Sequence, residues 1–132
     1  MFSLADRIES VSSEKALWEV ALDVAEAVGQ HPMRRSRWGK FLTRLGILCG
    51  PPPEVIFLTD KQFISGFLLP PNWIRYETST LHANPAVYSV GLRHASARPE
   101  DGAAVLGRSN YSLAVAYAAA AVRARAVEAG EL

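Results

Sequence analysis

Three side chains with polar tips lie among apolar neighbours in the middle of the chain. Trp73 offers an indole N–H, Tyr76 a phenol and Asn84 a carboxamide. A few such groups orient a small ligand, while apolar side chains supply most of the contact area. A ligand-binding role is therefore one interpretation of these three residues.

The same three residues also have plain structural interpretations. Trp73 and Tyr76 on an amphipathic helix pack in a core or an interface, with the phenol hydroxyl at the surface. Asn84 stands directly before a proline, which is typical of a helix N-cap followed by the first helical residue. Both interpretations stay open on the sequence alone.

A concentrated positive patch is the second candidate site. It begins at His31 and continues through an amphipathic stretch from Arg35 to Leu45, in which Trp38 and Phe41 alternate with cations. The functional interpretation is contact with an acidic protein, a phosphate backbone or another anionic surface. The alternative is a solvated helix face whose cations pair with the acids of the preceding helix. The cations of the patch are His31, Arg34, Arg35, Arg37, Lys40 and Arg44.

No catalytic or cofactor motif is present in the sequence. The histidines His31, His82 and His94 have no metal-ligand spacing with one another or with Cys49. A nucleophile elbow, a phosphate-binding glycine loop and paired carboxylates are also absent. We therefore expect no enzyme and no cofactor, although a triad assembled from distant residues stays open.

Length, composition and charge point to one soluble domain. The chain has 132 residues, and 49% of them are hydrophobic, which is enough for a core. Fourteen basic against thirteen acidic residues give no bulk attraction to nucleic acid or to an anionic membrane. The single cysteine fits a reducing compartment. Because we find neither a secretion signal nor a span-length apolar run, we expect a cytoplasmic protein.

Helical periodicity is strongest at the two ends of the chain. Leu4 and Ile8 predict a short opening helix, and a longer one runs from Ser12 or Ser13 to Gly29. The last helix is predicted over Tyr111 to Ala129, with Asn110 as its cap and Gly130 as its stop.

The middle of the chain predicts a small sheet and two further helices. Glu54 to Thr59 is a β-branched and aromatic run typical of a buried strand. Phe63 to Leu69 is a second strand or a one-turn helix. A helix carrying Trp73 to Leu81 follows, and Asn84–Pro85 opens another that extends to Ala95. Arg98 to Gly102 is a surface turn. This order predicts an α/β fold of the α+β type, a helix-rich single domain with its sheet covered by helices.

Two stretches resemble the autoinducer-binding domain of LuxR-type quorum-sensing regulators. One comprises Leu4–Ser10 and Ala16–Leu22, and the other runs from Pro70–Tyr76 to Asn84–Val87. The resemblance implies an acyl-homoserine lactone held between sheet and helices, with Trp73 donating to the lactone carbonyl. Asn84 stands where the family has an aspartate, and a neutral amide accepts a weaker hydrogen bond. Leu69 replaces a family tyrosine, and the family's DNA-binding domain is missing.

Two functions therefore stay open. The first, which follows the LuxR resemblance, is a stand-alone, sensor-like regulatory domain that acts through protein contacts and binds a small amphipathic ligand. Its pocket between sheet and helices is expected to be lined by Phe57, Phe67, Leu69, Trp73, Tyr76 and Val87. The second is an accessory subunit or antagonist without a ligand, which docks through the basic patch and forms a homodimer through the alanine-rich last helix. The face expected for self-association comprises Leu113, Tyr117, Ala120, Ala121 and Ala124.

Overall fold

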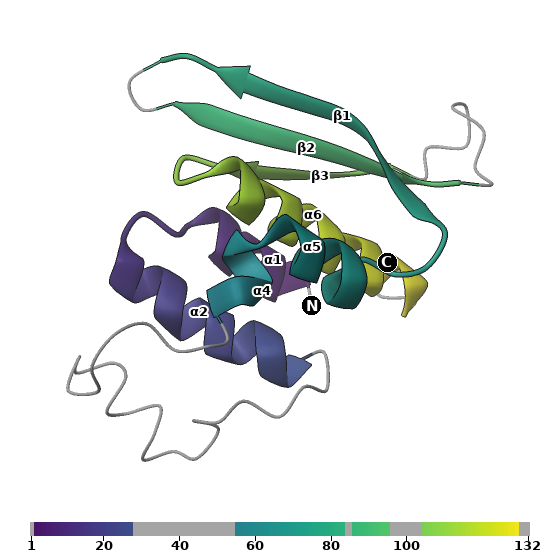
Figure 1. Ribbon diagram of the computed structural model, residues 1–132, viewed down its shortest axis with the longest axis horizontal. Helices are drawn as coiled ribbons and strands as arrows, with labels where there is room; N and C mark the ends of the chain where they lie inside the picture. The colour runs from purple at the N-terminus through teal and green to yellow at the C-terminus, as the bar shows by residue number, and fades with distance from the viewer. Residues whose placement is uncertain (1, 28–54, 84–85, 96–103, 130–132) are drawn as a thin grey trace.

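Helix α6 (Leu113–Glu128) is the element against which the rest of the fold packs (Figure 1). The computed structural model describes residues 2–27, 55–83, 86–95 and 104–129. Ten residues of α6 are buried, and seven of these are alanines. A helix that is apolar on every side is stable only between two layers. The sheet covers α6 on one side, and α1, α4 and η2 cover it on the other.

The sheet has three antiparallel strands in the order β1-β2-β3. These are β1 (Trp73–Leu81), β2 (Val87–His94) and β3 (Ala104–Ser109). Burial alternates along β3, where Val105, Gly107 and Ser109 are buried and face α6. In strand β2, Val90 and Leu92 pair with Gly107 and Val105 and so share the face toward α6. Gly91 between them is buried as well, on the other face under the Tyr76 ring.

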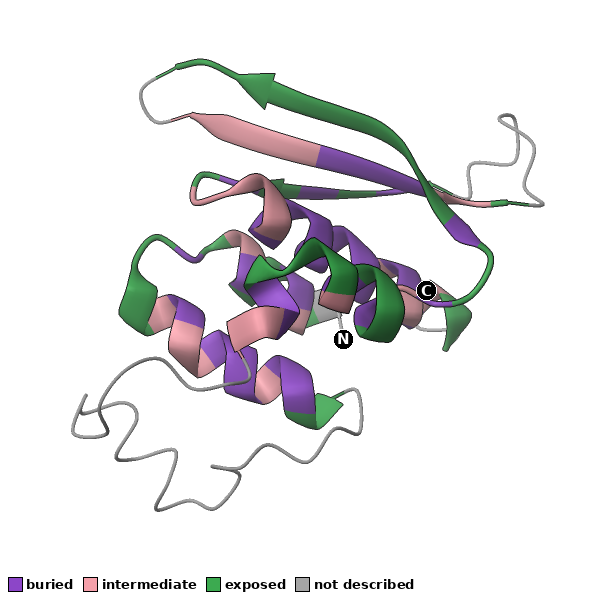
Figure 2. Ribbon diagram, viewed as in Figure 1, coloured by how far each residue is buried: buried purple, intermediate pink, exposed green. Residues whose placement is uncertain are grey.

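The helical layer is built from the first part of the chain and from a compact run of turns before β1. Its elements are α1 (Phe2–Glu9), α2 (Glu14–Ala27), α4 (Ile56–Thr59), α5 (Lys61–Phe63) and the π-helical turn η2 (Ile64–Leu68). The two N-terminal helices confirm the sequence prediction, and the Oγ of Ser13 accepts from the Ala16 amide at 3.3 Å as an N-cap does. Figure 2 shows that burial is concentrated in α6 and in the helices that cover it.

The predicted strand over Glu54 to Thr59 is wrong, because its described part is the short helix α4. A run of four to six apolar residues does not distinguish a buried strand from a buried helix. The helical alternative for Phe63 to Leu69 is confirmed by α5 and η2. The Asp60 side chain favours a helix here, because it accepts from the amides of Gln62 and Phe63 and so caps the start of α5.

The two helices predicted between Asn72 and Ala95 are also wrong, because these residues form strands β1 and β2. Ile74, Thr78 and Thr80 are β-branched, and such side chains favour a strand over a helix. The spacing of Val87, Leu92 and their apolar neighbours also fits one face of a helix. In the structure, the alternate residues Tyr88, Val90 and Leu92 share one face of strand β2.

Strand β3 was not predicted, and the cap of the last helix was misplaced. Glycine and small residues weaken the strand pattern of β3. Helix α6 is confirmed, but its N-cap is Ser112, whose side chain accepts from the Val115 amide, and not Asn110. The stretch Arg35 to Leu45, Cys49 and the turn at Arg98 to Gly102 lie outside the described residues. Within the described part, no helix has the length and apolar character that a bilayer crossing requires.

Gly107 sets the distance between the sheet and α6. A Cβ built at this position would lie 2.1 Å from the Ala116 carbonyl oxygen and 2.5 Å from the Ala120 backbone nitrogen. These neighbours are backbone atoms of a helix and cannot rotate away. Because the strand has a glycine and the helix has alanines at this contact, the two backbones approach more closely than larger side chains would permit.

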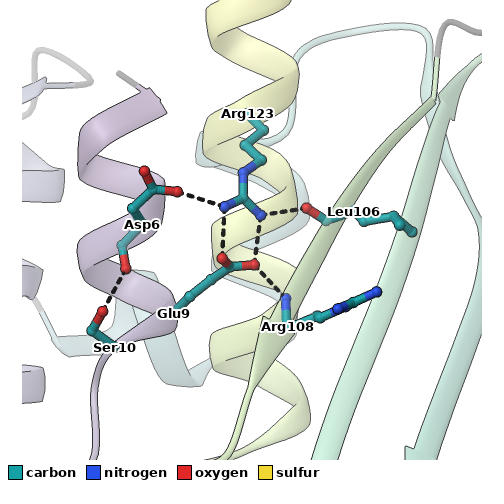
Figure 3. Close-up of polar contacts among 6 residues, drawn as sticks. All are labelled: Asp6, Glu9, Ser10, Leu106, Arg108 and Arg123. Atoms are coloured by element: carbon teal, nitrogen blue, oxygen red, sulfur yellow. Dashed lines mark hydrogen bonds and ion pairs between the residues drawn. The ribbon is translucent and has the colours of Figure 1, made fainter.

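One cluster of polar groups connects helix α1 to helix α6 and to strand β3 (Figure 3). The Arg123 guanidinium donates to both carboxylate oxygens of Glu9, at 2.5 and 2.6 Å, and to Asp6 at 2.8 Å. It also donates to the Leu106 carbonyl at 2.6 Å. The hydrogen bond with Glu9 raises the pKa of Arg123, while burial works in the other direction. Glu9 in turn accepts from the backbone amide of Arg108 at 2.8 Å, which joins α1 to β3.

We predict that Gly107→Ala lowers the free energy of unfolding by about 3 kcal/mol, because the helix and the sheet must separate to admit the methyl group. The matched control is Gly66→Ala in η2, where a built Cβ meets nothing within 4 Å. That control should leave stability unchanged or raise it by up to about 1 kcal/mol. Urea unfolding followed by circular dichroism measures both values, and equal midpoints for the two variants would contradict the close contact.

We predict that Glu9→Ala costs about 2–3 kcal/mol, since it leaves Arg123, which is 17% exposed, without its bidentate partner. The control is Arg7→Ala on the same helix, which removes an ion pair between Arg7 and Asp23 whose arginine is 51% exposed. An exposed pair contributes less than about 1 kcal/mol. The same unfolding measurement ranks the two variants, and a larger loss for Arg7→Ala would refute the assignment.

Candidate functional site

An open groove of about 440 Å³ lies between strand β1 and the helical turns α5 and η2. Its floor reaches Tyr117 of α6, so three parts of the fold contribute to it. The lining combines apolar side chains with cations and neutral polar groups. The residues are Lys61, Gln62, Ser65, Leu69, Trp73, Ile74, Arg75 and Tyr117.

The helical wall of the groove is held in place by two polar contacts. Asp60 caps α5 and so fixes the direction in which Lys61 and Gln62 leave the chain. At the other end, Arg125 of α6 donates from Nε to the Leu68 carbonyl at 2.7 Å and from Nη2 to the Phe67 carbonyl. These two carbonyls end η2 and would otherwise lack a partner within it. Burial lowers the pKa of Arg125.

Trp73 forms the base of the strand wall. Asn72, with φ at 69°, turns the chain into β1, and the indole that follows is buried. Its Nε1–H donates to the Glu128 carboxylate at 2.7 Å, and the His94 Nε2 lies 3.9 Å from the same oxygen. The donor that the LuxR resemblance assigns to a lactone carbonyl is therefore bonded to Glu128 in this structure.

Arg75 and Tyr117 give the groove its electrostatic character. The Arg75 guanidinium carbon lies 5.5 Å from the centroid of the Tyr117 ring, within cation–π range. Burial raises the pKa of the Tyr117 hydroxyl, and the nearby Arg75 charge partly opposes this. Lys61 adds a second positive charge on the opposite wall, and none of the described residues that line the groove carries a carboxylate. The groove therefore favours negatively charged groups.

The predicted ligand-binding residues are only partly brought together. Leu69 and Trp73 line the groove. Phe57 is buried in an aromatic cluster with Phe63 and Phe67, whose ring centroids lie 5.2 to 6.1 Å apart. Phe67 is itself 44% exposed.

The remaining predicted residues lie elsewhere. Tyr76 packs on the other face of the sheet, where its ring lies over Gly91, and Val87 pairs with Leu81 at the far end of the hairpin. Asn84 is outside the described residues, as are the basic-patch residues Arg34, Arg35, Arg37, Lys40 and Arg44.

The alanine face predicted for self-association lies inside the fold. Ala120, Ala121 and Ala124 are fully buried, and Tyr117 is 6% exposed. The close packing expected of a smooth helix is present, but the partners are the sheet and the helices of the same chain. We therefore do not retain α6 as an association surface.

Several groove residues were not predicted from the sequence. Lys61 and Gln62 lie in α5 and Ser65 lies in η2, ahead of the strand, and Ile74 and Arg75 lie in a segment that the sequence predicts to be helical. The Asp60 cap was the one local signal, because it marks a helix start immediately before Lys61.

A second hollow, of about 340 Å³, lies between α1 and α2. Its lining mixes the acids Asp6 and Glu19 with Arg7, which is paired with Asp23 at 2.6 Å. Because its charges have both signs and already interact, it selects no class of ligand. Among the described residues, no group of three histidine, cysteine or acidic side chains is placed to hold a metal.

No known family model, curated protein or solved structure matches this chain. The resemblance to LuxR-type regulators therefore stays a prediction from the sequence. The groove has to be interpreted from its own chemistry, which is a hydrophobic base with two cations at its walls and no carboxylate.

We predict that stability falls as the pH rises through the raised pKa of Tyr117. The unfolded tyrosine has a pKa near 10, so the contribution of the neutral, buried phenol is complete below that pH and is lost above it. Tyr117→Phe has no proton to release and should show a smaller alkaline loss. Urea midpoints between pH 8 and pH 11.5 measure the difference, and parallel curves for the two proteins would contradict it.

Proposed function

We propose that this protein is a non-catalytic regulatory domain that binds a partner protein in the groove between β1 and α5–η2. The observation that carries the proposal is the composition of this groove. Leu69, Trp73 and Ile74 offer apolar contact area, while Lys61 and Arg75 offer charge without a carboxylate among the lining residues. A partner that inserts apolar side chains and presents acidic groups would be complementary to both.

The contact between the sheet and α6 favours a protein partner over a ligand enclosed in the core. A small-molecule pocket needs about 300–1,000 Å³ that is largely shielded from water. At Gly107 the strand and the helix are in direct contact, and the adjacent residues Val90 and Val115 are fully buried. At this contact an acyl chain would fit only if the strand and the helix separated.

A small amphipathic ligand in the same groove is the second candidate. The volume of about 440 Å³ lies within the range of ligand pockets, and two residues expected to bind such a ligand, Leu69 and Trp73, belong to the lining. An acyl-homoserine lactone would then rest on the Trp73 ring without using its N–H. The open form of the groove leaves one side of such a ligand in water, which limits its affinity.

The test is affinity capture with two charge-reversal variants. The groove variant is Lys61→Glu with Arg75→Glu, and the control is Lys15→Glu with Arg108→Glu, which changes the net charge equally at exposed positions outside the groove. We expect the control to retain the wild-type partner and the groove variant to recover roughly one tenth or less of it. Mass spectrometry identifies the captured proteins and small molecules, and circular dichroism confirms that both variants fold.

The outcomes separate the candidates. A partner protein that the groove variant captures as well as the wild type would overturn the proposal. If the groove variant instead loses a small molecule while no protein depends on the groove, the second candidate replaces the first.

A further inference from the structure

Strand β1 forms one edge of the sheet beside the groove. It spans nine residues, and every one after Trp73 is exposed. Among the described residues, only β2 pairs with it. The outer edge of such a strand presents a row of unpaired N–H and C=O groups that can pair with another extended chain. In Figure 1 this strand extends beyond the helical layer that supports β2 and β3.

The alternation of the ladder shows which backbone groups face this free edge. The Ala95 amide donates to the Asn72 carbonyl at 2.6 Å, so residues 72 and 95 belong to the hydrogen-bonded class of pairs. In an antiparallel ladder the next pair, Trp73 with His94, belongs to the other class, and Ile74 with Arg93 is bonded again. The backbone groups of Trp73 and Arg75 therefore point away from β2. Both residues line the groove.

The irregularity after Arg75 limits the length of this edge. The register shifts between Arg75 and Glu77, which is a β-bulge at Tyr76. A bulge bends the strand and interrupts regular pairing, which protects an edge from unselective association. The regular edge next to the groove thus comprises residues 73 to 75, which is enough for a short segment of a partner.

The side chains around this edge define what the segment must carry. In an added strand, alternate side chains point to the same side, toward Tyr117 and the α5–η2 wall. There they meet Arg75, whose described contact is the Tyr117 ring, and Lys61 on the facing wall. The apolar part of the lining is Leu69, the exposed Ile74 and the largely buried Trp73.

From these features we infer that the groove binds an acidic peptide segment in extended form, which adds as a fourth strand to the free edge of β1. Carboxylates of the segment pair with Lys61 and Arg75, and its main chain bonds to Trp73 and Arg75. Main-chain bonds supply affinity in this mode of recognition, and the alternate side chains supply specificity. The inference rests on the proposed function, since it names the chemical class of the partner at the same groove.

The first experiment selects ligands without a bias toward acids. The folded full-length chain is used to select from a random nonapeptide display library, in parallel with the variant Lys61→Gln, Arg75→Gln. We expect the wild type to enrich peptides with Asp or Glu at alternate positions, and the variant to bind those peptides roughly tenfold more weakly. Enrichment of neutral or basic peptides, or no enrichment at all, overturns the acidic segment.

The second experiment tests the strand. A selected peptide is N-methylated at successive positions, and the amide exchange of Trp73 and Arg75 is followed by NMR. Methylation at every second position should abolish binding while the intervening positions tolerate it, and the two amides should become protected on binding. Tolerance at all positions, or unchanged exchange at both amides, overturns strand addition.

These failures differ from a failure of the proposed function. A partner protein can depend on the groove in the capture experiment while no acidic peptide is selected, and then only the inference falls. Sodium decanoate serves as a small anionic probe in the same NMR titration. If it shifts the groove residues while no peptide binds, the groove takes a small anion, and the peptide inference is wrong.

Discussion

The close contact between β3 and α6 is the constraint on which the rest of the structure depends. A Cβ at Gly107 would lie within 2.5 Å of two backbone atoms of the helix, so the two elements meet with only hydrogen and methyl groups between them. Because α6 is buried along nearly its whole length, it transmits this contact to both layers. The alanines of α6 allow the approach, and the β-branched residues Val115 and Val122 fill the core around it.

This arrangement leaves β1 without a supporting helix over most of its length. Helix α6 packs on β2 and β3, so β1 joins the sheet through β2 alone and stands at its exposed edge (Figures 1 and 2). Where β1 begins, Trp73 is bonded to Glu128 at the end of α6, which holds the base of the strand against the core. The groove is the space between this anchored base and the turns α5 and η2. The placement of the sheet on one helix thus creates the groove that we propose as a binding surface.

The face of the sheet that points away from α6 is distinct from the groove. Tyr76 and Leu106 are each 45% exposed, and Tyr76 covers the glycine that pairs with Leu106. The phenol ring thus shields part of a strand that carries no side chain at Gly91. Nothing in the described residues shows what else covers this face, and we assign no ligand to it.

The sequence predicted the class of fold and the terminal helices, but it misplaced the sheet. Leu17, Val20, Val24 and their neighbours recur over four turns, and such a long pattern is hard to mistake. In the run from Val55 to Leu58, four apolar residues carry no period. They form a helix in which the Asp60 amide donates to the Ile56 carbonyl, and this helix packs on α6. In β1, the exposed residues Glu77, Thr78 and Ser79 show no apolar alternation, because both faces of the strand meet water there.

The groove could not be predicted from the sequence, for a related reason. Its lining joins Lys61, Trp73 and Tyr117, and no local spacing links residues that are brought together only when α5 and β1 pack on α6. The prediction that Leu69 and Trp73 contribute to one site was consistent with the geometry, since both line the groove. The roles assigned to them by the LuxR resemblance depend on a free indole N–H, and here that group is bonded to Glu128.

Three arginines differ in whether their guanidinium groups bond within the fold or line the groove. Arg123 makes ion pairs with two carboxylates and a hydrogen bond to a carbonyl, so its guanidinium is saturated inside the fold. Arg125 donates hydrogen bonds to the Phe67 and Leu68 carbonyls at the end of η2. Arg75 differs, because its described contact is the face of an aromatic ring, which leaves its N–H donors directed to no carboxylate of the lining. A guanidinium with five donors, held over a ring beside an open strand edge, is preorganised for a carboxylate. In the proposed complex this side chain, which adds little to the core, would give the groove its selectivity for acidic groups.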